Sequence, residues 1–281
     1  MEFFSALAQH TFLQYALLGG LLASVGCGVM GTYVVVKRIG YLAGGIAHAV
    51  LGGMGVAYFF GAAPIVGALV AALVAALLVG WASLGREEER DAIIGALWAS
   101  GMALGILFIS QTPGYNVDLM SYLFGNILMI SSSDLLLMAA LDAVIIGATL
   151  LFARLFLAVC FDEQFALVRG VRVRLVYLFL LCLVALTVVL LVRVVGLILV
   201  IALLTLPAAI AGQLVGTVRR MMVVATVLGA VFTTSGLALA YGPDLPAGAV
   251  IVLLAGLTYL AVSVLRRRGS RSRFGLRQSG R

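Results

Sequence analysis

The chain is built from long apolar runs that are separated by short polar segments. Its mean hydropathy is +1.21 and only 10% of its residues are charged, which lies outside the range of soluble globular proteins. A membrane-spanning helix needs about 20 apolar residues to cross roughly 30 Å of hydrocarbon. Runs of this length recur along most of the 281 residues. The sequence therefore predicts an all-α, polytopic membrane helical bundle with no soluble domain attached.

Apolar runs of spanning length predict about eight or nine transmembrane helices. The expected spans are 12–36, 41–60, 62–84, 92–110, 134–158, 175–192, 195–214, 221–241 and 247–265. If 195–214 does not cross, eight spans remain and one end of the chain changes side. The shorter apolar piece from Leu119 to Ile130 fits a re-entrant or interfacial segment. Glu2 replaces the positive charge of a cleavable signal, so we expect the first run to remain as a span.

The basic residues predict which side of the membrane each loop faces. With the N-terminus outside, 16 of the 18 lysines and arginines fall in segments on one side. These segments are Lys37-Arg38, 86–91, 169–174, 219–220 and the tail. Positively charged loops remain in the cytoplasm. We therefore expect a multi-pass protein of the cell (inner or plasma) membrane, with one transmembrane domain at 1–265 and a basic cytoplasmic tail at 266–281.

Charge also bears on which functions are open to the chain. Lys37 is the only lysine, and no Gly-x-x-x-x-Gly-Lys-Ser/Thr run of a P-loop surrounds it. Uphill transport would then need an ion gradient or a separate ATPase subunit. Seven arginines lie in 266–281, directly after an apolar run, which is typical of an anchor beside anionic membrane lipid. No aromatic platform accompanies them, so we expect no nucleic-acid partner.

The second apolar run carries a histidine beside a line of small residues. Gly45, Ala49, Gly53 and Ala57 recur every four residues, which on a helix favours close approach of another backbone. His48 lies beside this face. An ionisable residue at membrane depth is a functional candidate, and neutral imidazole is a common ligand of transition metals. The alternative is a histidine that is hydrogen-bonded to a carbonyl group of a neighbouring helix.

Two more polar residues within apolar surroundings are candidate contacts for a cation. Asn126 could present its amide oxygen to a passing ion, or it could cap a short helix. Asp142 lies about two turns into its span, where a carboxylate should face protein or water rather than lipid. It could line a cation path, or it could be neutral or paired internally. The candidate metal contacts are therefore His48, Asn126 and Asp142.

The segment 161–172 predicts a short amphipathic helix on the cytoplasmic side. The residues expected to form it are Phe161, Asp162, Glu163, Phe165, Val168, Arg169 and Gly170. Its apolar members form a one-sided stripe, its acidic members occupy the first turn, and its glycine is a plausible stop. Such a helix suits docking into a groove on a partner. The alternative is a helix that lies on the membrane surface.

Four stretches of the sequence occur together in a specific order and spacing. They are Gly-Gly-Ile-Ala-His-Ala-Val-Leu-Gly-Gly around His48, Ser-Tyr-Leu-Phe-Gly-Asn-Ile-Leu around Asn126, the segment 161–171, and the pair 195–209 and 244–249. Each stretch alone is weak. Together they resemble the membrane permeases of zinc/manganese/iron-type metal-ion ABC importers, and the similarity covers nearly the whole chain.

The resemblance implies a fold, a set of partners and a transported ion. It implies a vitamin-B12-permease-like, type II permease domain that forms a homodimer, with the translocation path at the dimer axis. It also implies cytoplasmic ATP-binding-cassette ATPase subunits that bind ATP, and an extracytoplasmic metal-binding protein. The helix at 161–172 would be the coupling helix to the ATPase. The chain itself would hold no cofactor, would not be an enzyme, and would pass Zn2+ (favoured), Mn2+ or Fe2+.

One position departs from the family pattern, and one rival function stays open. Many members carry an Asp three residues before the histidine, where this chain has Gly45. A path that hands the cation on without a tight site is compatible with that change.

The rival function is a proton-coupled secondary metal-ion carrier with Asp142 and His48 as its proton relay. Inverted repeats would favour it, and none is convincing; an intramembrane enzyme lacks its expected HExxH helix.

Overall fold

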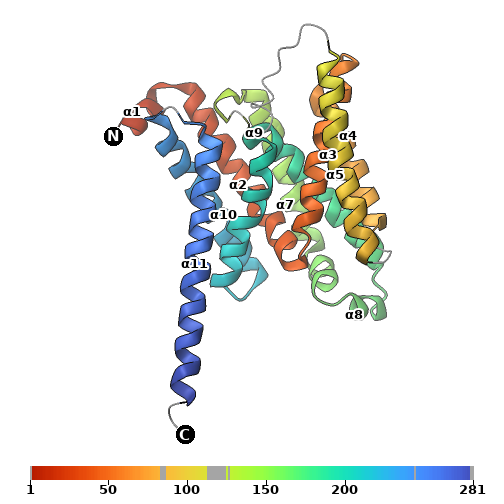
Figure 1. The fold of residues 1–281 in the computed structure, drawn as a ribbon, viewed down its shortest axis with the longest axis vertical. Coiled ribbons are helices and arrows are strands. Elements are labelled where there is room, and N and C mark those ends of the chain that lie inside the picture. Colours follow the sequence, from red (N-terminus) through yellow and green to blue (C-terminus); the bar gives the residue numbers. More distant parts are fainter. Residues whose placement is uncertain (1, 83–86, 113–124, 126, 244, 279–281) are drawn as a thin grey trace.

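The fold is known from a computed structural model, which describes residues 2–82, 87–112, 125, 127–243 and 245–278. These residues form a bundle of helices (Figure 1). The elements are α1 (Glu2–Gln9), α2 (Thr11–Lys37), α3 (Gly40–Phe59), α4 (Pro64–Ala82), α5 (Glu87–Ser110), the short 3-10 helix η1 (Ile127–Met129), α7 (Ser132–Phe161), α8 (Glu163–Val168), α9 (Val173–Leu214), α10 (Val218–Tyr241) and α11 (Ala247–Gln278). The predicted all-α membrane bundle is confirmed.

Within the described residues, eight helices are long and apolar enough to cross a membrane. They correspond to eight of the nine expected spans. The remaining expected span, 195–214, is the shorter second half of α9, with Val200–Leu214 as its apolar part. The two halves of α9 meet at Gly196, where φ is 73° and ψ is 173°. Glycine adopts this left-handed φ without steric cost, so the chain can change direction there.

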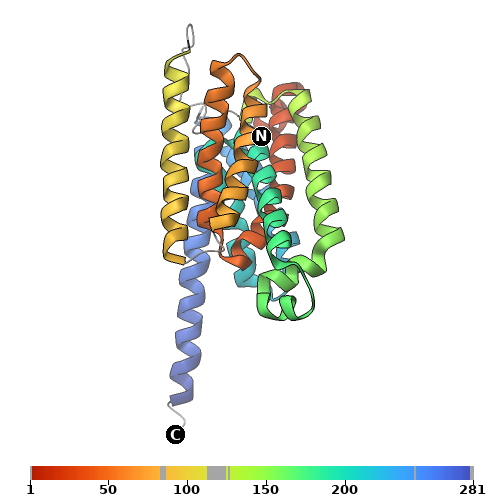
Figure 2. The ribbon, with the colours of Figure 1, turned by 90° about the vertical axis from the view of Figure 1, so that its right-hand side faces the viewer.

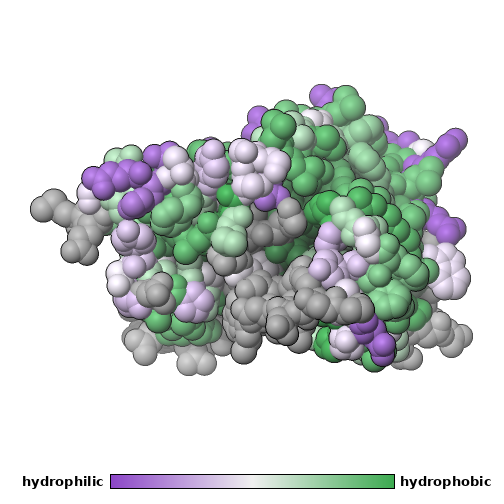
Figure 3. All heavy atoms as spheres, turned by 90° about the horizontal axis from the view of Figure 1, so that it is seen from above, coloured by the Kyte–Doolittle hydropathy of each residue, from purple (hydrophilic) through white to green (hydrophobic). Residues whose placement is uncertain are grey.

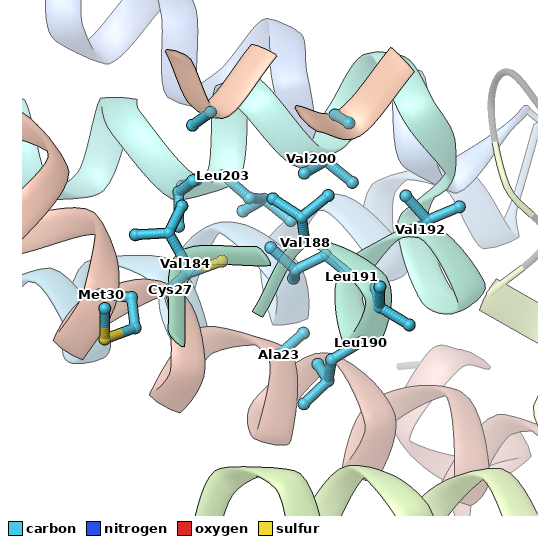
Figure 4. Close-up of a cluster of buried hydrophobic side chains, with 14 of the residues drawn as sticks. Ala23, Cys27, Met30, Val184, Val188, Leu190, Leu191, Val192, Val200 and Leu203 are labelled. Atoms are coloured by element: carbon cyan, nitrogen blue, oxygen red, sulfur yellow. The ribbon is translucent and has the colours of Figure 1, made fainter. Parts of the chain in front are cut away.

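The two halves of α9 run antiparallel to each other. Figure 4 shows Val184 and Val188 of the first half facing Leu203 and Val200 of the second half, within one buried apolar cluster. Residues that come later in the first half thus meet residues that come earlier in the second half. The second half therefore returns toward the end of the bundle at which α9 begins.

The segments that were predicted to be cytoplasmic gather at one end of the bundle. Lys37, at the end of α2, contacts Glu163 of α8. Gly212, near the end of α9, lies beside Met221 at the start of α10. In Figure 1, α8 and the C-terminal end of α11 both lie at the lower end, opposite the N-terminus. This arrangement agrees with the predicted orientation of the loops.

The last helix continues past the predicted domain boundary at residue 265. α11 runs from Ala247 to Gln278, and its final part extends beyond the rest of the bundle (Figures 1 and 2). The charge pattern predicted where the apolar span ends. It did not predict that the helix would continue.

Buried apolar side chains of α2 and α9 pack against each other in the core. Cys27 and Met30 of α2 are 1% and 0% exposed and lie in the cluster of Figure 4, where they fill space between the helices. Large apolar side chains also cover the outside of the bundle, as expected for a surface in contact with lipid. Seen end-on, apolar residues dominate the described surface on the side of α3 to α5, with hydrophilic residues at the periphery (Figure 3).

Candidate functional site

α3, the helix of His48, packs between α4 and α5 through glycines on both sides. On the α5 side, a methyl group added at Gly52 would lie 2.7 Å from the carbonyl oxygen of Gly101. On the α4 side, a methyl group at Gly53 or Gly67 would collide with the carbonyl oxygen of the other. Close backbone approach through glycine is a recurrent way of packing membrane helices. The polypeptide around His48 is thus held from two directions.

The predicted face of small residues does not meet a single neighbour. Gly45 and Ala49 lie against α5, whereas Gly53 and Ala57 lie against α4. The physical reason is the pitch of the helix. With 3.6 residues per turn, each four-residue step drifts by about 40°, so three steps cover about 120°. One line of small residues therefore serves two helix contacts.

His48 is buried at the contact of α3 with α5. Its side chain is 8% exposed, and its ring stacks on Trp98 of α5 with centroids 4.1 Å apart and planes inclined by 18°. Its Nδ1 atom is buried and has no hydrogen-bond partner among the residues that the structure describes. The predicted alternative of a hydrogen bond to a neighbouring carbonyl is therefore not found at this atom. A buried nitrogen without a partner marks a place where another group can bind.

Asp142 is buried on α7, against α2. Its side chain is 4% exposed, and a methyl group at Gly26 of α2 would lie 2.8 Å from Oδ1. Within the described part of the chain, neither carboxyl oxygen has a hydrogen-bond partner. An unpaired buried charge is strongly destabilising. Asp142 is therefore suited to binding a cation or a proton, and its carboxylate lies directly against α2.

The structure does not bring His48 and Asp142 together. α5, against which His48 packs, and α7, which carries Asp142, lie at opposite edges of the bundle in Figure 2. Across the described ranges, no group of three or more His, Cys, Asp or Glu side chains could hold a metal ion. Asn126 lies outside the described residues. The described part of the chain thus offers single candidate ligands in separate places, without a direct His48–Asp142 relay.

Within the predicted helical segment 161–172, the structure has a shorter helix, α8, which runs from Glu163 to Val168. Asp162 is its N-cap, and the Asp162 side chain accepts a hydrogen bond of 2.8 Å from the backbone N–H of Phe165. Arg169 is the C-cap and its guanidinium lies over the ring of Phe165, 5.1 Å from the centroid. Gly170 follows with a φ of 77°, which ends the helix as glycine commonly does.

The apolar side chains of α8 point away from the bundle. Phe161 is 69% exposed, Phe165 54% and Val168 88%, whereas Ala166 on the opposite side is buried. Phe161, the last residue of α7, and the exposed Phe165 and Val168 of α8 form an apolar surface that a partner or a membrane surface would cover. This geometry fits both readings of the segment that the sequence left open.

Lys37 ties α8 to the end of α2, a link that the sequence did not reveal. Its Nζ donates a hydrogen bond of 2.9 Å to the carbonyl oxygen of Val159 near the end of α7, and it forms an ion pair with Glu163. Nζ also lies 5.9 Å from the ring centroid of Tyr177. The only signal in the sequence was the presence of a single lysine, because spacing cannot predict a contact between residues 126 positions apart.

Comparisons with known proteins agree with this architecture. The family model described as the ABC 3 transport family matches residues 9–266. The chain is 40% identical to a probable metal transport system membrane protein of Chlamydia pneumoniae, over 94% of each chain. It is 32% identical to the manganese transport system membrane protein MntC of Halalkalibacterium halodurans, over 92% of this chain and 88% of that one. The solved structure of PsaBC from Streptococcus pneumoniae in complex with Fab matches with a TM-score of 0.85, 30% identity and coverage of 93% and 94%. The chain therefore belongs to the ABC 3 transport family, as a multi-pass membrane protein.

Proposed function

We propose that this chain is the permease subunit of an ATP-driven importer that carries a divalent transition-metal ion into the cytoplasm. The observation that carries the proposal is His48, a buried imidazole with an unpartnered Nδ1 atom at a membrane-embedded helix contact. Membership of the ABC 3 transport family supports it. His48 would be a contact of the ion within the membrane.

Mn2+ is the first candidate for the transported ion. Similar proteins are named for manganese transport, whereas the Zn2+ favoured by the sequence finds no support in those names. A histidine nitrogen and carboxylate or amide oxygens suit Mn2+, Zn2+ and Fe2+ alike. The choice among them is therefore an experimental question, and Zn2+ is the competitor to include in every assay.

The proposed partners are cytoplasmic ATPase subunits, an extracytoplasmic metal-binding protein and a second copy of this chain. α8 would dock into the ATPase through Phe165 and Val168, the side chains that it exposes. We further propose that 1–265 is the permease domain and that 266–281 is a cytoplasmic tail beside anionic lipid.

A short mechanical path joins α8 to His48. Glu163 of α8 pairs with Lys37 at the end of α2, and only Arg38 and Ile39 separate Lys37 from the first residue of α3. Arg38 has a φ of 60°, which makes this connection a tight left-handed turn. A displacement of α8 by the ATPase would thus move the inner ends of α2 and α3 together. Separation of α3 from α5 would then open the surroundings of His48.

Asn126 and Asp142 remain proposed contacts elsewhere on the path. Asp142 would take part only in a state in which Gly26 no longer covers it, because its oxygens are buried against α2. A cation that met these residues one after another would be handed on without a tight site. Rapid passage of this kind fits the presence of Gly45 in place of an acidic residue.

Cells that lack the gene test this function directly. They are grown under manganese starvation, and the content of manganese, zinc and iron is measured by elemental analysis. We expect manganese to fall and to be restored by the intact gene but not by its His48→Gln variant. Selective loss of zinc or iron would instead identify a different ion. Unchanged contents of all three metals would contradict the proposal.

A further inference from the structure

We propose that Trp98 is a positioning residue for the transported ion. Its indole clamps the imidazole of His48 with Nδ1 buried, and the ion binds there only after the clamp opens. This inference rests on the proposed role of His48 as a metal contact. It adds a device that determines when that contact becomes available.

The clamp is a face-to-face stack. The rings of His48 and Trp98 lie 4.1 Å apart at 18°, and a second aromatic ring, that of Tyr41, lies 6.0 Å from Trp98 at 34°. Stacking of aromatic rings stabilises a pair beyond the burial of area. A metal ion binds imidazole in the plane of the ring, at a nitrogen lone pair. The stack therefore does not occupy the binding position, but it fixes the direction in which each nitrogen points.

A glycine of α3 provides the surface on which the half-buried indole lies. A methyl group at Gly44 would lie 3.1 Å from Cζ3 of Trp98, so the absence of a side chain at this position gives the indole its seat. About one turn further along α5, a methyl group at Gly101 would lie 3.0 Å from the carbonyl oxygen of His48. Because the two backbones are this close, separation of the two helices would also part the rings.

The stacked rings extend from His48 toward the predicted cytoplasmic end of α3, which is the direction in which the ion would be transported. Tyr41 lies in the first turn of α3, near the predicted cytoplasmic end, and is 50% exposed. His48 lies seven residues further along the helix, which is about 10 Å. The three rings therefore connect the buried imidazole with the inner surface of the bundle. Opening of α3 from α5 at the inner end would release Trp98 and would uncover Nδ1 of His48.

The native fluorescence of Trp98 tests the clamp without altering it. The chain has two tryptophans, and the other, Trp81, is 65% exposed at the inner end of α4. In a Trp81→Phe variant of the full chain, reconstituted in lipid nanodiscs, the emission of this protein comes from Trp98 alone. We expect MnCl2 to quench this emission and equal MgCl2 not to do so. Loss of the quenching in His48→Gln would place the ion at the stack.

Variants of Trp98 supply a second, quantitative readout. Trp98→Ala should free the imidazole and lower the half-saturating Mn2+ concentration about fivefold, the factor that corresponds to about 1 kcal/mol. Trp98→Phe keeps a stacked ring and should restore the native value. Trp81→Ala, the matched control, should not change it. If Trp98→Ala does not fold, the quenching experiment and the Mn2+ affinity of Trp98→Phe still test whether Trp98 positions His48.

The two proposals fail in different ways. If His48→Gln binds and transports Mn2+ like the native chain, His48 is not a metal contact. The proposed role of Trp98 is then contradicted as well. If His48→Gln abolishes binding but Mn2+ leaves the Trp98 emission unchanged, or Trp98→Ala leaves the half-saturating concentration unchanged, the clamp alone is overturned.

Discussion

The α3–α5 contact and the α7–α8 end of the molecule depart from ordinary packing in opposite ways. At the first, glycines bring two backbones together around a polar side chain, His48, that has an unpartnered nitrogen. At the second, apolar side chains project outward, with Val168 88% exposed. A buried polar group without a partner and an exposed apolar patch are both unfavourable alone. Each therefore marks a place where another molecule is expected to complete the structure, an ion in one case and a protein in the other.

The two regions also differ in how they can be perturbed. The α3–α5 contact is held by backbone approach, so small additions of volume should disturb it. α8 is held by caps and by the Lys37–Glu163 pair, so its outward side can change without loss of folding. Variants that affect one region and spare the other test whether this division is real.

Phe165→Asp should have the largest effect on transport. The side chain is 54% exposed, so we expect the protein to fold and accumulate normally. An aromatic anchor in an interface commonly contributes 2 kcal/mol or more, so ATP-driven uptake should fall by about thirtyfold or more. Co-purification of the ATPase subunit measures the same loss. Glu163→Arg should act in the same direction, because it also breaks the pair with Lys37.

A matched variant at the opposite end of the bundle controls for the change itself. Phe60 lies just after α3 and is 72% exposed, so Phe60→Asp introduces the same charge at a similarly exposed phenylalanine. It should leave co-purification of the ATPase intact. Normal uptake in Phe165→Asp would remove the coupling role of α8.

Gly53→Ala should lower stability, whereas Gly147→Ala should not. The new methyl group at Gly53 would meet the backbone of Gly67, and overpacking of this kind costs roughly 1–3 kcal/mol. Gly147, on α7, has open space around its missing side chain. Alanine there should be neutral or stabilising by up to about 1 kcal/mol. Thermal unfolding in detergent compares the two, and equal shifts would show that the α3–α4 contact is not tight.

Lys37→Ala should have the smallest effect. The pair with Glu163 is partly exposed, with side-chain exposures of 16% and 52%, and such pairs are worth about 1 kcal/mol or less. Uptake should therefore fall by no more than about fivefold. The exchange Lys37→Glu with Glu163→Lys should recover part of this loss. If the double variant transports worse than either single variant, the pair does not carry motion from α8.

Much of the fold could be predicted because its signals are local. Apolar runs of spanning length, the loop charges, and the capping residues of α8 all depend on neighbours in the sequence. The break in α9 was also predicted, because Arg193 lies between the expected spans 175–192 and 195–214, and the φ of 73° at Gly196 shows where the helix reverses.

The candidate site was predicted less completely, because its contacts are long-range. The sequence indicated His48 but not Trp98, since an aromatic residue in an apolar span can equally face lipid. It also grouped His48 with Asp142, although the structure places them against different helices. Composition can suggest which side chains are unusual. Their neighbours depend on how the helices pack in space, which no local sequence pattern records.

Uptake of Mn2+ by proteoliposomes that contain the complete transporter tests the central claim most directly. The chain has two histidines, and His10 is exposed at the start of α2, so His10→Gln is a matched control for His48→Gln. The account predicts that His48→Gln lowers ATP-driven uptake about tenfold or more, as loss of a metal contact does, while His10→Gln transports normally. Equal uptake by His48→Gln and the native protein, at the same half-saturating Mn2+ concentration, would contradict it.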